Sequence, residues 1–241
     1  VIVDEPENKI QQDKPPFSDS YLGDLSWIPS GKITVRVPYT SDIRLVHVRN
    51  DFWLSQLLVT QEVYTEVMGT NPSDVDTDGG AEVINLPVNR VSWLDAVEFC
   101  KALTVLAKDS GSLPKNHEFR LPTEVEWEYA CRAGTTTAYS WGATIASSNA
   151  NYNWDGAYNT GVDFKQTRDV GQYAANPWGF FDMHGNVREW TADWYQAAYP
   201  NGNPVVDPTG PASGSARVTR GGSWNNDGTL LRSAKRSNNT P

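Results

Sequence analysis

Three short segments alternate apolar and polar residues in the manner of a strand with one buried face. They are Lys32–Val37 (KITVRV), Ile43–Val48 (IRLVHV) and Ala216–Arg220 (ARVTR). The polar residues Pro38–Asp42 between the first two predict a turn, and Gly221–Gly222 ends the third. The pattern therefore predicts short strands near both ends of the chain.

Helices are predicted where a capping residue precedes an apolar stripe. The first runs over Thr60–Met68, with threonine as its N-cap and a glycine just past its end. Capping boxes at Ser92–Asp95 and Thr123–Glu126 begin two more, because an acid three residues after the N-cap can bond back to it. The last of these helices stops by Gly134.

The periodicity is lost after Gly134. Long stretches of Asn, Gly, Asp and aromatic residues follow, and the whole chain holds ten tryptophans. Early helices, late irregular loops and short strands throughout predict a loop-rich α+β fold. We expect tryptophan packing to hold the long loops.

The first 27 residues differ in composition from the rest. They are polar and acidic, and Pro6, Pro15 and Pro16 break them. Such a segment cannot bury enough apolar area to offset the entropy of ordering. We therefore expect a flexible acidic N-terminal tail over residues 1–27 and one domain over residues 28–241.

Charge and hydropathy exclude several classes of function. With 20 basic and 29 acidic residues the net charge is −9, so nucleic acid is not expected as a partner. No run of about 18 apolar residues occurs, so no transmembrane segment is expected in this chain. Two cysteines and three histidines provide neither a disulfide scaffold nor a four-thiolate zinc site.

Oxygen ligands for a hard cation occur in two places. Asp74–Gly79 (DVDTDG) matches the start of a calcium loop, but Asn85 stands where a bidentate glutamate is needed, which favours a solvated acidic loop. Asn186 and Glu189 either join a cation site or serve as a turn cap and a buried partner of an arginine. Further oxygens are offered by Asn151, Asn153, Asp155 and Asp163.

The usual signatures of an enzyme are absent from the sequence. Cys100 and Cys131 fall among the packing residues of predicted helices, which favours core thiols over nucleophiles. No Walker A loop, GxGxxG, HExxH, CxxC or GxSxG segment occurs. Residue patterns alone therefore predict no catalytic site.

The last twenty residues mix apolar side chains with amides and hydroxyls. Within Gly222–Pro241, the pair Leu230–Leu231 lies among polar residues, so it is either part of a core or an exposed patch. Aromatic residues beside adaptable amides are typical of binding loops.

Several segments in family order resemble the formylglycine-generating-enzyme (sulfatase-modifying factor) family. The most specific are RLPTEVEWEYACRAG (Arg120–Gly134), NPWGFFDMHGNVREW (Asn176–Trp190) and RGGSW (Arg220–Trp224). The resemblance implies the formylglycine-generating-enzyme-like variant of the C-type lectin fold, loop-rich with short strands and a few helices.

The family's oxidation chemistry is not implied for this chain. Its enzymes bind copper through two cysteines between the GGS(W/Y/F) and Asn-Thr-Pro motifs. Here that interval, residues 225–238, holds no cysteine; Ser233 stands near the place of the second, and Gly228 or a neighbour near that of the first. A hydroxyl and a glycine cannot replace thiolates on a soft metal. The family's calcium ligands would fall on Asn151, Asp163, Asn186 and Glu189, so structural calcium is the one cofactor considered.

A narrower resemblance is to variable proteins that retroelements diversify, such as the treponemal variable protein, which use this fold as a scaffold. In that class adenine-directed mutagenesis rewrites AAY codons, from which Asn, Thr, Asp, Ser, Gly and Leu can all descend. Residues of such identity stand between the fixed-looking GGSW, RSA and NTP motifs. The resemblance implies a variable ligand-binding region over residues 216–241. Its predicted ligand-binding residues are Thr219, Trp224, Asn226, Asp227, Gly228, Thr229, Leu230, Leu231, Lys235 and Ser237.

We therefore expect a noncatalytic ligand-binding (display) protein and not an enzyme. One alternative is a divergent oxidoreductase of the same family with different chemistry, and another is a module that packs against a partner subunit. The expected ligand is an unknown protein or cell-surface macromolecule. We expect a monomer that is exported to the bacterial cell surface, as a lipoprotein whose anchor lies outside this chain.

Overall fold

The computed structural model describes residues 17–36, 42–74, 85–153, 165–198 and 204–241. Its helices are α1 (Gln61–Met68), α2 (Trp93–Asp109) and α3 (Glu124–Arg132), so all three predicted helices are confirmed. None of the helices in these ranges has the length and apolarity needed to cross a membrane.

The ends of the helices follow from the capping residues in the sequence. The Thr60 side chain accepts a hydrogen bond from the Val63 N–H, and Gly69 ends α1 with a left-handed φ of 74°. Ser92 and Thr123 each form a complete capping box with the acid three residues on. At the end of α3, Ala133 is the left-handed C-cap, and the predicted glycine, Gly134, follows it with a φ of 85°.

The strands form three sheets of three strands each in the described part of the chain. Predicted strands 32–37 and 43–48 are confirmed as an antiparallel pair, and predicted strand 216–220 is confirmed in the third sheet. The sheet orders are β1 (Phe17–Asp19), β2 (Gly23–Ile28), β5 (Phe52–Ser55); β3 (Gly31–Arg36), β4 (Ile43–Val48), β7 (Val205–Val206); and β6 (Glu189–Trp194), β8 (Arg217–Arg220), β9 (Ser237–Asn239).

The predicted N-terminal tail is too long, because residues 17–27 belong to the folded domain. β1 pairs with β2, and β2 pairs with β5, so this segment contributes two strands to a sheet. Its acid Asp19 is buried, and one carboxylate oxygen accepts the N–H groups of Tyr21 and Leu22. A locally satisfied acid is compatible with burial, which composition alone does not reveal. Residues 1–16 lie outside the described ranges.

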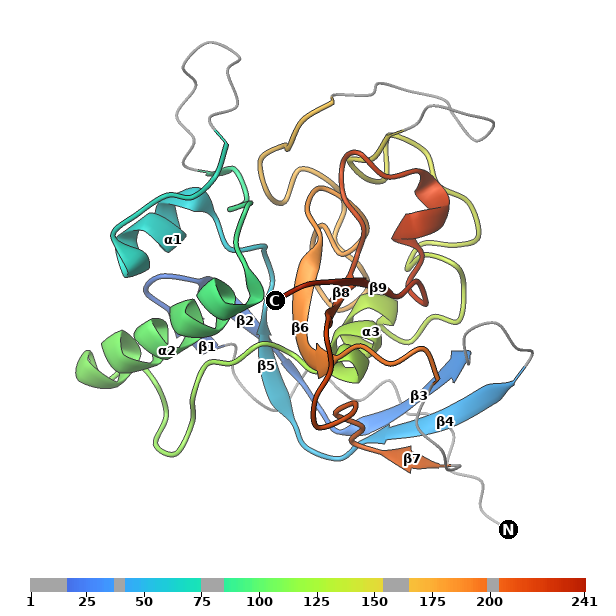
Figure 1. Cartoon of the computed structure of the whole chain (residues 1–241), viewed down its shortest axis with the longest axis horizontal. Helices are drawn as coiled ribbons and strands as arrows, with labels where there is room; N and C mark the ends of the chain where they lie inside the picture. The colour runs from blue at the N-terminus through green and yellow to red at the C-terminus, as the bar shows by residue number, and fades with distance from the viewer. Residues whose placement is uncertain (1–16, 37–41, 75–84, 154–164, 199–203) are drawn as a thin grey trace.

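The elements pack around separate apolar clusters. α1 and α2 lie beside β1, β2 and β5 on one side of the molecule, with Tyr64 of α1 stacked on Phe99 of α2 (Figure 1). α3 packs against β4, β6 and β8, with Trp127 fully buried in the largest cluster. The C-terminal 3-10 helix over Gly228–Leu231 lies on the other side, against the loops of residues 138–152.

The side chain of Arg217 fixes the N-terminal end of β8. The Arg217 guanidinium lies between the rings of Trp93 and Trp194, 3.6 Å from each centroid. It also donates to the main-chain oxygen of Ala192 at 2.6 Å. This cation–π sandwich joins the start of α2 to β6 and β8, so here tryptophan packing holds regular elements together and not the long loops.

Candidate ligand-binding site

Two glycines let the chain turn sharply after β8. Gly221 and Gly222 have φ angles of 82° and 73°, in the left-handed region that favours glycine. A Cβ on Gly222 would lie 2.7 Å from Cδ1 of Leu231. The turn therefore packs directly against the 3-10 helix, within the C-terminal segment (residues 216–241).

A buried arginine ties the C-terminal segment to α3. Arg220 is fully buried and pairs with Glu128, whose other oxygen accepts from Arg132 Nε at 2.9 Å. Arg220 also donates to the main-chain oxygens of Ser233, at 2.9 Å, and of Lys235. A buried guanidinium is stable only when its charge and its N–H groups are paired. These hydrogen bonds therefore hold the backbone of residues 233–235 against α3.

A second arginine fixes the next residue to the same helix. Arg236 donates from Nε and Nη2 to the two carboxylate oxygens of Glu124, at 2.6 and 2.8 Å. Such a bidentate pair fixes orientation as well as distance. Glu124 and Glu128 are four residues apart on α3, so the two acids share one face of the helix.

A buried histidine holds the end of the 3-10 helix. Its Nδ1 lies 2.7 Å from the main-chain oxygen of Leu231 and donates to it, while Nε2 of His184 accepts from the Ser140 N–H at 3.2 Å. Burial lowers the pKa of His184 to about 4 and raises that of Cys131, whose Sγ lies 3.5 Å from Nε2, to about 12. The pair is therefore neutral, and Cys131 is a core thiol without nucleophilic character.

The start of the 3-10 helix is held by an aromatic side chain. The hydroxyl of Tyr139 donates to the main-chain oxygen of Gly228 at 2.6 Å. Asp227 caps the helix, since its Oδ1 accepts the Thr229 N–H at 2.8 Å. Leu230 and Leu231 both pack on the apolar cluster that contains Tyr139, but only Leu231 is fully buried.

The predicted ligand-binding residues differ widely in exposure. Asp227 is exposed, and a further six are half-buried, namely Trp224, Asn226, Thr229, Leu230, Lys235 and Ser237. Asn226 is occupied within the fold, because its Oδ1 accepts from Ser223 and from the Arg188 guanidinium. The neighbouring Asn225, which is not among the predicted residues, is exposed.

Three predicted ligand-binding residues do not reach the outer surface. Leu231 and Gly228 are buried against Tyr139 and Ile145, and Thr219 of β8 is 1% exposed opposite Ser237. These three residues pack inside the domain and support the C-terminal segment from that side. Gly228 and Leu231 are therefore not outward residues, whereas Thr219 lines the adjoining pocket, and their role in ligand binding stays a prediction. Of the leucine pair, Leu231 belongs to a core and Leu230 is half-buried.

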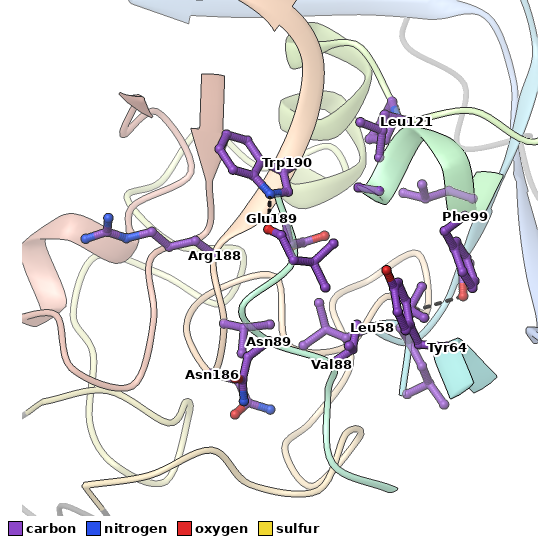
Figure 2. A pocket seen from close by; sticks show the side chains of 18 of the residues that line it. Leu58, Tyr64, Val88, Asn89, Phe99, Leu121, Asn186, Arg188, Glu189 and Trp190 are labelled. Atoms are coloured by element: carbon purple, nitrogen blue, oxygen red, sulfur yellow. Dashed lines mark hydrogen bonds between the residues drawn. The ribbon is translucent and has the colours of Figure 1, made fainter. Parts of the chain in front are cut away.

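A pocket of about 580 Å³ adjoins the C-terminal segment. Its inner wall is apolar and comes from β5, α1 and α2, including Tyr64 and Phe99, as Figure 2 shows. At the other end lie Arg188, Glu189 and Trp190, whose indole N–H donates to the Val91 main-chain oxygen at 2.9 Å. The C-terminal segment contributes Thr219, Ser223, Trp224, Asn225 and Asn239 to the lining.

The sequence matches the family described as the sulfatase-modifying factor enzyme 1-like domain over residues 11–241. The chain belongs to this family. It is 38% identical to the formylglycine-generating enzyme of Mus musculus over 167 residues, 65% of this chain and 41% of that protein. It is 39% identical to the enzyme of that name from Streptomyces coelicolor over 168 residues, 65% of this chain and 49% of that protein. The chain thus spans less than half the length of these curated relatives.

A solved structure with a similar fold is Treponema denticola variable protein 1. Its TM-score is 0.73 at 27% sequence identity, and the match covers 90% of each chain. The loop-rich C-type-lectin-like fold of the formylglycine-generating enzymes, expected from the motifs, is confirmed by this match and by the family.

Within the sulfatase-modifying factor family, this chain differs at the place of the expected copper-binding cysteines. Ser233 is buried there, with its N–H and hydroxyl directed at the Ala138 main-chain oxygen. Gly228 packs against Ile145 and Tyr139. The only cysteines, Cys100 of α2 and Cys131 of α3, are free thiols, and burial raises the pKa of Cys100 to about 11. No sulfur ligand is therefore available on the C-terminal segment.

The predicted calcium ligands lie in different surroundings. Asn186 Oδ1 accepts from Asn151 Nδ2 at 3.2 Å and from the Arg168 N–H at 3.0 Å, which uses both lone pairs of that oxygen. Glu189 Oε1 lies near Gly221, and burial raises its pKa to about 7. Asp163 lies outside the described ranges.

The described ranges hold no group of three His, Cys, Asp or Glu side chains suited to a metal. A calcium site that uses Asp163 stays a prediction. In the other candidate loop, Asp74 pairs with Arg90 at 2.5 Å, and residues 75–84 lie outside the described ranges.

We expect folding stability to fall between pH 5 and pH 8, with Asp193 as one cause. Burial and the charges of Glu124 and Glu126 raise the pKa of Asp193 to about 7, although the Glu124 N–H and Arg236 oppose them. A carboxyl with a raised pKa binds its proton more tightly when folded. Its stabilisation is therefore complete below about pH 4 and is lost as the pH rises through 7.

The measurement is the free energy of unfolding, obtained by urea denaturation at pH 5 and at pH 8. Asp193→Asn keeps an oxygen for the Glu124 N–H and should reduce the fall by on the order of 2–4 kcal/mol. Glu189, whose pKa is also raised to about 7, adds to the remaining fall, whereas His184, whose pKa is lowered to about 4, opposes it. An Asp193→Asn variant with an unchanged pH dependence would contradict this cause.

Proposed function

We propose that this protein is a noncatalytic ligand-binding protein whose C-terminal segment forms a changeable binding face. The observation that carries the proposal is the way this segment is held. Main-chain oxygens of the segment accept hydrogen bonds from three buried side chains, Arg220, His184 and Tyr139, and none of these three is an outward residue. Outward side chains other than Asp227, which caps the 3-10 helix, can therefore change with little effect on the fold.

The binding face combines the outward residues of the segment with one end of the pocket. Its outward members are Asn225, Asp227, Thr229, Leu230 and Lys235, each exposed or half-buried. Trp224 and Asn225 also line the pocket, so the face continues inward. Similarity to Treponema denticola variable protein 1 supports this division into a scaffold and a changeable face.

We further propose that a retroelement diversifies this face. The test is deep sequencing of the 3′ end of the gene in a culture grown from one cell. Substitutions at adenine positions are expected at codons 225, 227, 229, 230 and 235. The matched controls are the codons for the buried residues Gly228, Leu231 and Ser233, which should stay unchanged. A uniform gene, or substitutions spread evenly over buried and outward codons, would contradict diversification of a face.

The second candidate function is an oxidoreductase, favoured by relatives that are named formylglycine-generating enzymes. That activity needs a thiolate pair for copper, and residues 225–238 hold no cysteine. We therefore expect less than stoichiometric copper after reconstitution with Cu(I) and dialysis, measured by elemental analysis. A Cys100→Ser/Cys131→Ser variant is the control for adventitious binding. Stoichiometric copper in the unaltered protein and not in this variant would favour the enzyme.

The proposed ligand is a protein or other cell-surface macromolecule, bound by a monomer. Display implies export to the bacterial surface, and a lipid anchor on a part outside this chain would hold the domain there. Surface proteolysis of intact cells, followed by an antibody against the domain, tests the location.

A further inference from the structure

We propose that Trp141 is a constant anchor of the binding face. Its exposed indole is fixed beside the 3-10 helix and takes an apolar or cationic side chain of a protein ligand. The inference rests on the proposed function, because it names a ligand contact outside the C-terminal segment. Nothing in the sequence motifs singled out this residue.

The indole of Trp141 is held on several sides although it is 38% exposed. Its Nε1 donates to the Thr144 main-chain oxygen at 2.9 Å. Its ring stacks on Tyr139 with centroids 5.4 Å apart and planes 4° apart, and meets the His184 ring edge-on at 4.8 Å. Because the N–H is satisfied and the ring is fixed, binding costs this side chain little rotamer entropy.

The same two rings hold the changeable segment. Tyr139 donates to the Gly228 main-chain oxygen, and His184 to that of Leu231. Those carbonyls belong to the first and last residues of the 3-10 helix, which carries Thr229 and Leu230. Trp141 contacts both of these rings, and each ring bonds one end of the helix. The position of Trp141 relative to the helix is therefore fixed.

A face of this composition needs an anchor. Its outward residues are small or polar apart from the half-buried Leu230, and its aromatic member Trp224 lines the pocket at one end of the face. Binding energy at interfaces concentrates in a few rigid aromatic residues. Of the other exposed large apolar residues in the described ranges, Ile43 and Val206 lie on β4 and β7, Leu57 follows β5, and Leu94 and Val105 lie on α2, on the opposite side of the molecule from the 3-10 helix (Figure 1). The net charge of −9 attracts basic ligands, and an indole face binds a guanidinium or ammonium group well.

The experiment uses the full chain displayed on phage, with codons 225, 227, 229, 230 and 235 randomised. Lysozyme, a small basic protein, is the selection probe. In the selected binders, Trp141→Ala should raise the Kd by about 10-fold or more, and Trp141→Phe, which keeps the stack on Tyr139, by about 3-fold. The matched control is Leu94→Ala, which should change Kd by less than about 2-fold. Unfolding midpoints confirm that each variant is folded.

The outcomes separate the two proposals. Binders that lose affinity with Trp141→Ala or Trp141→Phe while remaining folded support the anchor. Binders that keep their Kd in both variants overturn the anchor and leave the proposed function standing. A selection that yields no binder overturns the changeable face, and the anchor with it.

Discussion

Replacing Arg220 by leucine is expected to lower the free energy of unfolding by about 3–5 kcal/mol. The guanidinium is 0% exposed, and it bonds Glu128 and the main-chain oxygens of Ser233 and Lys235. Leucine would leave a buried carboxylate with one partner, Arg132, and two carbonyls without this donor. Chemical denaturation in urea measures the loss, provided that the m-value is unchanged.

The control for Arg220 is an arginine whose ion pair is exposed. Arg49 donates to Asp207 at 2.8 Å, but its side chain is 70% exposed. Arg49→Leu should therefore cost no more than about 1 kcal/mol. If the two variants lose the same amount, the buried network does not hold the C-terminal segment. Hydrogen exchange should also quicken at residues 233–236 in Arg220→Leu and remain unchanged in Arg49→Leu.

The helices could be predicted because their signals are local. Thr60, Ser92 and Thr123 each satisfy N–H groups within the next three residues, so a few neighbouring letters determine where a helix begins. The same holds for β3, where the apolar Ile33 and Val35 are the buried positions. In β4 the match is partial, because Val46 and Val48 are buried but Ile43 is exposed.

Strand β6 escaped prediction because its buried positions are polar. Thr191 and Asp193 face inward, whereas Trp190 and Trp194 are half-buried, so the apolar alternation is inverted. Thr191 donates to the Val218 main-chain oxygen, and Asp193 accepts from the Glu124 N–H. These partners lie 27 and 69 residues away in the sequence, so no local pattern of residues predicts them.

The support of the binding face is equally non-local. Arg220 and Arg236 meet acids of α3 that lie 92 and 112 residues away, and hydropathy would place both arginines at the surface. The family motifs predict this segment as the ligand-binding region, but they could not distinguish the buried Gly228 and Leu231 from the half-buried Thr229 and Leu230.

Leu230 and Leu231 provide the sharpest test of the distinction between outward and buried residues in this segment. Leu231→Asn is expected to lower the free energy of unfolding by about 2–5 kcal/mol, because it removes a fully buried side chain and buries an amide. Leu231 packs with Tyr139 and Tyr152, and its Cδ1 lies against Gly222, so the space cannot accommodate a polar group.

The neighbouring Leu230→Asn is the matched control, with the same chemical change at a half-buried position. It should cost less than about 1 kcal/mol in urea denaturation, since water can solvate the new amide. In a selected binder, however, Leu230→Asn should change Kd, whereas the loss from Leu231→Asn should appear first in stability. Equal destabilisation by both variants would mean that both leucines belong to the scaffold, and codon 230 would then have to be removed from the changeable face.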